Sequence, residues 1–144
     1  MPITISGSGT VTGISAGGLP DDCITTADIA ANAVTTAKLG SSEASGLAKA
    51  WVNFNGTGTV AIRASFNVSS ITDNGTGDYT VNFTTALVDA NYSVAASGGG
   101  GASSGTVFLC PRGANPSASA VRLYAITAND TLDDTVFVSV AIFR

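Results

Sequence analysis

The sequence predicts an all-β protein: an antiparallel β-sandwich head, jelly-roll-like in its winding, preceded by an extended N-terminal segment and a short stem with helical turns. Three observations lead to this prediction. Short runs with a period of two, separated by turn residues, fill the C-terminal two thirds of the chain. A ten-residue repeat precedes these runs, and a Gly-rich segment comes first. About half of the chain is Gly, Ala, Ser or Thr, so the side chains are small.

The composition excludes several classes of function. Only 11% of the residues are charged and 44% are hydrophobic, which is the opposite of the balance found in disordered chains. His is absent, which excludes imidazole catalysis and His metal ligands. Six basic residues are too few for a nucleic-acid surface, and no apolar run is long enough to cross a membrane. We therefore expect no cofactor, no metal, no nucleic acid and no membrane insertion.

The segment from Met1 to Asp22 is predicted to be extended, with little core of its own. Thr, Val and Ile favour extended backbone, but Gly interrupts the run repeatedly and a Gly-Leu-Pro-Asp-Asp turn ends it. We expect it to become ordered only when another molecule packs on it. Its large apolar residues are Ile3, Ile5, Val11 and Ile14.

The segment from Cys23 to Leu47 contains the repeat. ITTADIAANA is followed by VTTAKLGSSE, so large aliphatic residues recur every five positions. A spacing of five fits neither a regular helix nor a strand, whereas one short helical turn per repeat, capped by Thr26 and Thr36, would fit. Turns this short are not stable alone, so the aliphatic residues need an external partner. These residues are Ile24, Ile29, Val34 and Leu39.

From Ala48 to Arg144 the chain predicts seven short strands, the number found in many sandwiches. A hairpin is expected at the sequence DNGTGD, residues 73–78. The last strand has apolar or small side chains on both faces, so it is either central in a sheet or covered by another subunit. The expected strands are Ala50–Asn55, Val60–Val68, Asp78–Thr84, Asn91–Ala96, Thr106–Pro111, Ala120–Thr127 and Thr135–Phe143.

The acidic residues and the Cys residues do not predict a catalytic or metal site. DNGTGD lacks the spacing and the terminal Glu of an EF-hand loop, so a plain hairpin tip is favoured. Adjacent Asp133 and Asp134 are predicted to form a solvated turn rather than a catalytic pair. Cys23 and Cys110 lie far apart and can form one disulfide at most; free and mostly buried thiols are favoured.

Aromatic and Arg side chains supply the candidates for an exposed contact. Carbohydrate-binding surfaces use Trp or Tyr beside polar groups, but sandwiches also use these residues in their cores. Trp51, on the first strand after the repeat, is expected to pack where stem and head meet. The candidate contact residues are Tyr92, Tyr124, Arg112 and Arg122.

Two stretches resemble the fibre proteins of tailed bacteriophages. ISGSGTVTGISAGGLPDDCITTADIAANAVTTAKL resembles their stem segments, in which units of the type I/V-T-T-A-K/D-I/L are common and often tandem. AWVNFNGTGTVAIRASFNVSSITDNGTGDYTVNFTTALVDANYSV resembles the head domain that often follows, and this stretch is the more specific. Together they cover nearly the whole chain up to Val94. Only two repeat units are present, and Cys23 stands where Gly or Ser is usual, so a long shaft is not expected.

The resemblance implies a homotrimer on the surface of a bacteriophage virion. Three chains wound together would give each stem aliphatic residue a symmetric layer. Residues 1–22 would attach the fibre to another virion protein of the capsid, collar or tail, residues 23–47 would form the trimeric stem, and residues 48–144 would form the head. The head would contact a glycan or protein of the host surface through three weak identical sites.

Two alternatives to a receptor-binding fibre remain open. A chain this short, starting at its own Met, also fits a capsid or head-fibre decoration protein with no receptor role. A capsule depolymerase is a remote alternative because it needs acid and base carboxylates in a groove, and we expect no enzyme. The head could supply carboxylates only from Asp73, Asp78, Asp89, Asp130, Asp133 and Asp134.

Overall fold

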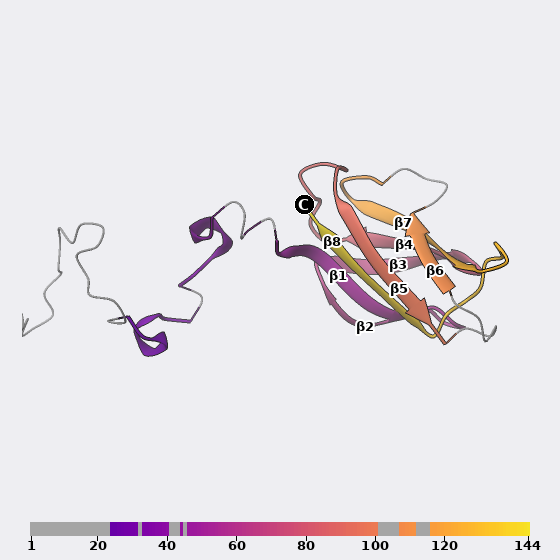
Figure 1. Ribbon diagram of the computed structural model, residues 1–144, viewed down its shortest axis with the longest axis horizontal. Helices are drawn as coiled ribbons and strands as arrows, with labels where there is room; N and C mark the ends of the chain where they lie inside the picture. The colour runs from indigo at the N-terminus through magenta and orange to yellow at the C-terminus, as the bar shows by residue number, and fades with distance from the viewer. Residues whose placement is uncertain (1–23, 32, 41–43, 45, 101–106, 112–115) are drawn as a thin grey trace, which may run out of the picture. The chain divides into compact units, whose positions relative to one another are not determined.

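The computed structural model describes residues 24–31, 33–40, 44, 46–100, 107–111 and 116–144. The chain divides into two compact units, Met1–Leu39 and Gly40–Arg144 (Figure 1). Several sequence predictions concern residues outside the described ranges. They are the virion-attachment residues Ile3, Ile5, Val11 and Ile14, the thiol of Cys23, and the candidate contact Arg112.

Each copy of the repeat in the first unit contains a single 3₁₀ turn. The turns are η1 (Thr26–Asp28) and η2 (Thr36–Lys38). The Lys38 amide donates to the Thr35 carbonyl at 2.9 Å, and the Lys38 ammonium donates to the Ala33 carbonyl at 2.8 Å. Around these turns the repeat's aliphatic side chains remain in water: Ile24, Ile29 and Val34 are 55%, 44% and 57% exposed, and Leu39 is half-buried.

The second unit is all-β and consists of two four-stranded antiparallel sheets (Figure 1). The strands are β1 (Ala48–Asn55), β2 (Ala61–Phe66), β3 (Val68–Gly75), β4 (Asp78–Phe83), β5 (Ser93–Gly99), β6 (Val107–Pro111), β7 (Ala120–Thr127) and β8 (Phe137–Phe143). Sheet A has the order β2-β1-β8-β5, and sheet B has the order β3-β4-β7-β6. The predicted all-β class and its sandwich-like architecture are confirmed.

The two sheets share one hydrophobic core. Alternate residues of β1 and β8 in sheet A and of β4 and β7 in sheet B belong to the same buried cluster, because successive side chains of a strand point to opposite faces. The Phe54 and Tyr79 rings meet edge to face at 5.3 Å across the sheets. Strand β8 lies between β1 and β5, so it is a central strand. The buried residues of the four strands are Ala50, Val52, Phe54, Tyr79, Val81, Phe83, Val121, Leu123, Ala125, Val138, Val140 and Ile142.

Strand β3 was not predicted from the sequence. The expected strand Val60–Val68 is present as β2, but its C-terminal bound is wrong, because the chain leaves sheet A after Phe66 and enters sheet B at Val68. Asn67 makes this corner with a φ of 54°, and its side-chain amide donates to the carbonyls of Lys49 and Thr85 at 3.0 and 3.1 Å. Strand β3 lies at a sheet edge and is largely exposed, so it lacks the alternating aliphatic residues of a core strand.

The hairpin predicted at residues 73–78 is confirmed. Strands β3 and β4 pair antiparallel, with Gly75 opposite Asp78 at the end of the ladder. The backbone amide of Gly75 donates to the Asp73 carboxylate at 3.0 Å. The Asp73 side chain therefore closes the turn, as Asp side chains commonly do.

Gly56, directly after β1, lies where three segments meet. Its amide donates to the Thr135 carbonyl at 2.9 Å, and its carbonyl accepts the Tyr79 hydroxyl at 2.8 Å. A Cβ at this position would stand 2.6 Å from the Tyr79 hydroxyl oxygen and 2.8 Å from the Thr135 carbonyl oxygen. Because Tyr79 is fully buried and the second neighbour is backbone, neither atom has room to move.

Gly56→Ala is therefore expected to destabilise the second unit by about 1–3 kcal/mol through overpacking. Gly99→Ala is the matched control: Gly99 is the last residue of β5, and nothing stands within 4 Å of a Cβ placed there. That control should stay within about 1 kcal/mol of wild type. Urea unfolding of the two variants measures the difference. Equal urea midpoints for Gly56→Ala and Gly99→Ala would show that the structure around Gly56 accommodates a Cβ without overpacking.

Candidate functional site

Two of the predicted contact residues lie together on the outer face of sheet B. Arg122 and Tyr124 occupy alternate positions of β7, and the guanidinium carbon stands 5.4 Å from the centre of the Tyr124 ring. Asp78 of β4 is the register partner of Tyr124. The Arg122 guanidinium donates to both oxygens of the Asp78 carboxylate, at 2.8 and 2.5 Å. The result is a cation held between a carboxylate and an aromatic ring.

The ion pair changes the acidity of both partners. Hydrogen bonds from Arg122 lower the pKa of Asp78, and this effect outweighs the burial of Asp78, which raises it. The Asp78 hydrogen bonds in turn raise the pKa of Arg122. Asn74 adds a third donor to the Asp78 carboxylate at 3.3 Å. Asp78 is therefore held ionised, and the exposed part of Arg122 and the ring of Tyr124 are what this face offers to a ligand.

Hydroxyl and amide groups continue this outer face across β3 and β4. The Asn82 amide donates to the Ser70 and Thr72 hydroxyls at 3.1 and 2.9 Å, and the Asn74 amide donates to the Thr80 hydroxyl at 2.9 Å. These cross-strand bonds form a polar surface beside the Arg122–Tyr124 pair. Such a face is well hydrated, as expected for the outer side of an antiparallel sheet.

Tyr92 lies elsewhere and makes structural contacts. Its hydroxyl donates to the carbonyls of Ser117 and Ala120, both at 3.1 Å, and its ring meets Phe83 edge to face at 6.0 Å. Burial raises the pKa of Tyr92. The structure therefore brings Arg122 and Tyr124 together, but it places Tyr92 against the edge of the core.

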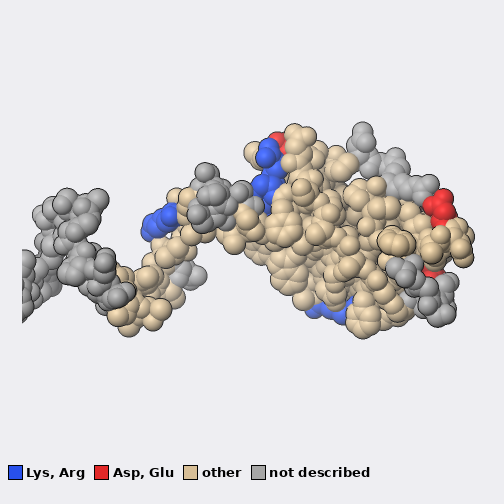
Figure 2. Space-filling view, viewed as in Figure 1, with Lys and Arg blue, Asp and Glu red and all other residues tan. Residues whose placement is uncertain are grey.

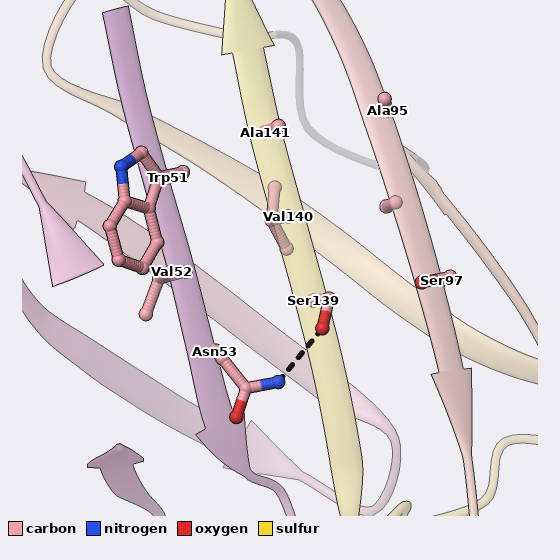
Figure 3. Close-up of a pocket in the computed structure, with 9 residues that line it drawn as sticks. Trp51, Val52, Asn53, Ala95, Ser97, Ser139, Val140 and Ala141 are labelled. Atoms are coloured by element: carbon pink, nitrogen blue, oxygen red, sulfur yellow. Dashed lines mark hydrogen bonds between the residues drawn. The ribbon is translucent and has the colours of Figure 1, made fainter. Parts of the chain in front are cut away.

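Sequence reasoning missed a shallow depression of about 360 Å³ on the outer face of sheet A (Figure 3). Trp51, 40% exposed, stands at one side of it. Ala95 and Ala141 form part of its floor, and the Asn53 amide donates to the Ser139 hydroxyl within it at 2.8 Å. The alternation along β1 contained the signal, because Trp51 and Asn53 occupy the positions between the buried residues of that strand.

Two further carboxylates considered for a depolymerase accept hydrogen bonds from other parts of the head. Asp134 accepts the Tyr79 hydroxyl at 3.0 Å and the Gly77 amide at 2.7 Å. Asp89 accepts two hydrogen bonds from Arg144, which lower the pKa of Asp89 to about 2. In the described ranges no group of three or more His, Cys, Asp or Glu could hold a metal ion. Cys110 is a free, half-buried thiol.

Comparison with known proteins identifies no relative: no family model, no curated protein and no solved structure matches this chain. Within the part of the chain that the structure describes, no helix has the length and apolar character needed to cross a bilayer.

Asp78→Asn tests the ion pair through pH. Because the folded pKa of Asp78 lies below its ordinary value of 3.8, ionised Asp78 stabilises the fold above that pH, and this stabilisation is lost as the pH falls through the folded pKa. We expect wild type to exceed Asp78→Asn in stability at pH 7, and the gap to narrow below about pH 4. Urea unfolding at several pH values measures the gap.

The matched control for this prediction is Asp73→Asn, on the same hairpin. The Asn side-chain oxygen can still accept the Gly75 amide, so this control should lower stability less than Asp78→Asn at pH 7. A gap between wild type and Asp78→Asn that stays constant from pH 7 to pH 2 would contradict the assignment of the stabilisation to the ionised carboxylate.

Proposed function

We propose that this chain is a structural subunit of a short homotrimeric bacteriophage fibre whose β-sandwich head is displayed for host-surface attachment. The observation that carries the proposal is the exposure of the aliphatic ladder of the stem, by which we mean Ile24, Ile29, Val34 and Leu39. Ile24, Ile29 and Val34 recur at a spacing of five, and each is more than 40% exposed in the single chain. The likeness of the repeat to phage stem segments supports the same assignment.

Removing the exposed aliphatic side chains of the stem from water favours association of the chains. Fully burying an aliphatic side chain of this size contributes about 1.5–3 kcal/mol, and the single chain leaves most of that contribution unrealised. A closed ring of chains would bury the same residue of every copy in one layer, whereas an open assembly would leave ends. In the proposed trimer, Ile24, Ile29, Val34 and Leu39 each form such a layer.

In the proposed fibre, three consecutive segments of the chain have three different roles. Residues 1–22 bind another virion protein, residues 23–47 form the trimeric stem, and residues 48–144 form the head. Eight strands in two antiparallel sheets support a sandwich head, and the pairing of the first strand β1 with the last strand β8 is the feature that it shares with a jelly roll. The outer face of sheet B, with Arg122 and Tyr124, is the proposed receptor contact, because its polar groups suit a glycan or a protein surface.

Ile29→Asp is expected to convert the trimer to single chains, because three carboxylates would be forced into one dry layer. Sedimentation equilibrium of the full chain measures the mass. Ala30→Asp is the matched control: it places the same charge on the next residue, which is exposed and lies outside the ladder, and it should leave the trimer intact. An Ile29→Asp protein that sediments as a trimer would show that this layer does not hold the chains together.

Deletion of residues 1–22 is expected to leave the head folded and to remove the protein from virions. The hydrophobic core of the second unit is formed by described residues of the head between Ala50 and Ile142, so the urea transition of that unit should not change. Immunoblots of purified particles measure incorporation, with the full-length chain as control. Recovery of the truncated chain on particles at the full-length ratio would show that residues 1–22 are not the attachment segment.

Binding of the purified full-length protein to host cells tests the receptor role separately. A protein that is incorporated into virions and also binds cells supports host attachment. A protein that is incorporated but does not bind cells is a capsid decoration protein, and the receptor role would then be wrong.

A further inference from the structure

The outer face of sheet A differs from an ordinary solvent-exposed sheet face. Cross-strand register places Phe66, Trp51, Ala141 and Ala95 in one row and Ala64, Asn53, Ser139 and Ser97 in the next. Neither row contains a charged residue. Antiparallel sheets that face water normally alternate apolar residues inward with polar residues outward, as β4 of sheet B does. In Figure 2 the charged side chains lie at the margins of the surface over β1, β8 and β5, and its middle is uncharged.

Three exposed aromatic side chains lie on sheet A, two of them side by side on β1 and β2 and one at the start of β8. Trp51, Phe66 and Phe137 are 40%, 55% and 56% exposed. The Arg63 guanidinium carbon lies 4.6 Å from the centre of the Phe137 ring, while the same guanidinium donates to the carbonyls of Phe54 and Val136 at 2.9 and 2.7 Å. The same guanidinium also donates to the Asn53 side-chain oxygen at 3.5 Å, and the ammonium of Lys49, two residues before Trp51 on β1, donates to the Ala44 carbonyl. Both cations next to this face are therefore engaged within the chain. Exposed aromatic rings beside small side chains are common at interaction sites.

The face has a ridge and a hollow side by side. Trp51 and Phe66, on β1 and β2, form the ridge, and the depression over β8 and β5 is floored by small side chains (Figure 3). A ridge beside a hollow suits a head-to-tail contact, in which the ridge of one copy enters the hollow of the next. Repeating such a contact around a rotation axis closes a ring.

We infer that the outer face of sheet A is the interface between the heads of neighbouring copies of this chain, with Trp51 of one copy packed into the Ala95–Ala141 depression of the next. This inference rests on the proposed homotrimer. The receptor contact on sheet B would then face outward, away from the other two heads.

A ring divides this face between two neighbours. Four strands at about 4.8 Å spacing and about seven residues long give roughly 450 Å² in projection, so each contact receives roughly half of that area. This is below the roughly 800 Å² per partner of a standard interface, and such a contact is weak between free chains. It becomes effective when the stem holds the heads at a high local concentration.

A second copy fits this face better than a saccharide. A sugar needs free hydrogen-bond donors and acceptors beside the aromatic ring, but the Asn53 amide already donates to the Ser139 hydroxyl and the Val138 carbonyl. In the row of Trp51 the floor consists of the methyl groups of Ala95 and Ala141, which gain from packing against an aromatic ring and not from contact with hydroxyls. The stem repeat also precedes β1 directly in the sequence, so association through the stem would raise the local concentration of the heads and favour contacts between copies.

Trp51 reports on this interface because it is the only Trp of the chain. Acrylamide quenching of Trp51 fluorescence, measured on the full chain together with its sedimentation mass, requires no change to the head. The quenching constant of the wild-type trimer should be roughly threefold or more below that of the Ile29→Asp single chain, because a packed interface excludes the quencher. A trimer in which Trp51 is quenched as strongly as in the single chain would overturn the inference and leave the proposed trimer intact.

A wild-type protein that sediments as a single chain would overturn the proposed trimer itself, so the two failures are distinguishable. If Trp51 is exposed in the trimer and a neutral oligosaccharide then protects it from acrylamide, the face is a saccharide site and the inference is wrong.

Ala95→Glu provides an independent variant test. A carboxylate in the hollow should weaken the trimer about tenfold or more and raise the quenching of Trp51 toward that of the single chain. Ala86→Glu, on the exposed loop after β4, is the matched control and should change neither quantity. Circular dichroism confirms that both variants fold. An Ala95→Glu trimer with wild-type affinity and a protected Trp51 would contradict the inference.

Discussion

The shared core of the two sheets is the constraint on which the rest of the structure depends. Burying Val52 and Phe54 from β1 fixes the register of that strand, and the strand period of two then places Trp51 and Asn53 outside. The same rule places Arg122 and Tyr124 outside because Val121 and Leu123 of the same strand are in the core. Both candidate surfaces of the head therefore follow from the choice of core residues. A register shift of one residue in β1 or β7 would move the core side chains of that strand to the surface and its surface side chains into the core.

The two outer faces produced by that core differ in chemistry. On sheet B, hydroxyls, amides and the Asp78–Arg122 pair cover β3, β4 and part of β7, and Phe108 of β6 is exposed beside them. On sheet A, an uncharged row of rings and methyl groups lies beside a row that includes Asn53, Ser139 and Ser97. A protein with 11% charged residues cannot place charges on every face, and here the Asp78–Arg122 ion pair lies on sheet B. Such a difference is expected when one side meets solvent or a ligand and the other is covered in the assembly.

The sequence predicted most of the fold but only part of the site. Strand β4 alternates polar with large apolar residues, and β8 alternates aliphatic residues with small or aromatic ones, so the local pattern suffices to find them. Strand β3 was not predicted because it is an edge strand that buries few side chains and carries polar residues on both faces. Which strands pair is a non-local property: Asp78 meets Arg122 across 44 residues only because β4 and β7 are neighbours. Trp51 was placed on the correct strand, but its face depends on which neighbours are buried.

Small side chains make the proposed assembly energetically feasible. Ordering a Lys or Glu at an interface costs about 1.5–2 kcal/mol of side-chain entropy, whereas Ala costs nothing and Ser little. The floor of the sheet A depression is built from Ala95, Ala141, Ser97 and Ser139, so covering it loses little conformational freedom. The gain then comes from a few large groups, Trp51 and Phe66 on the head and the aliphatic ladder on the stem. Neither surface is large alone, but because one chain links them, formation of the stem layers would lower the entropic cost of the head contact, and the two would associate cooperatively.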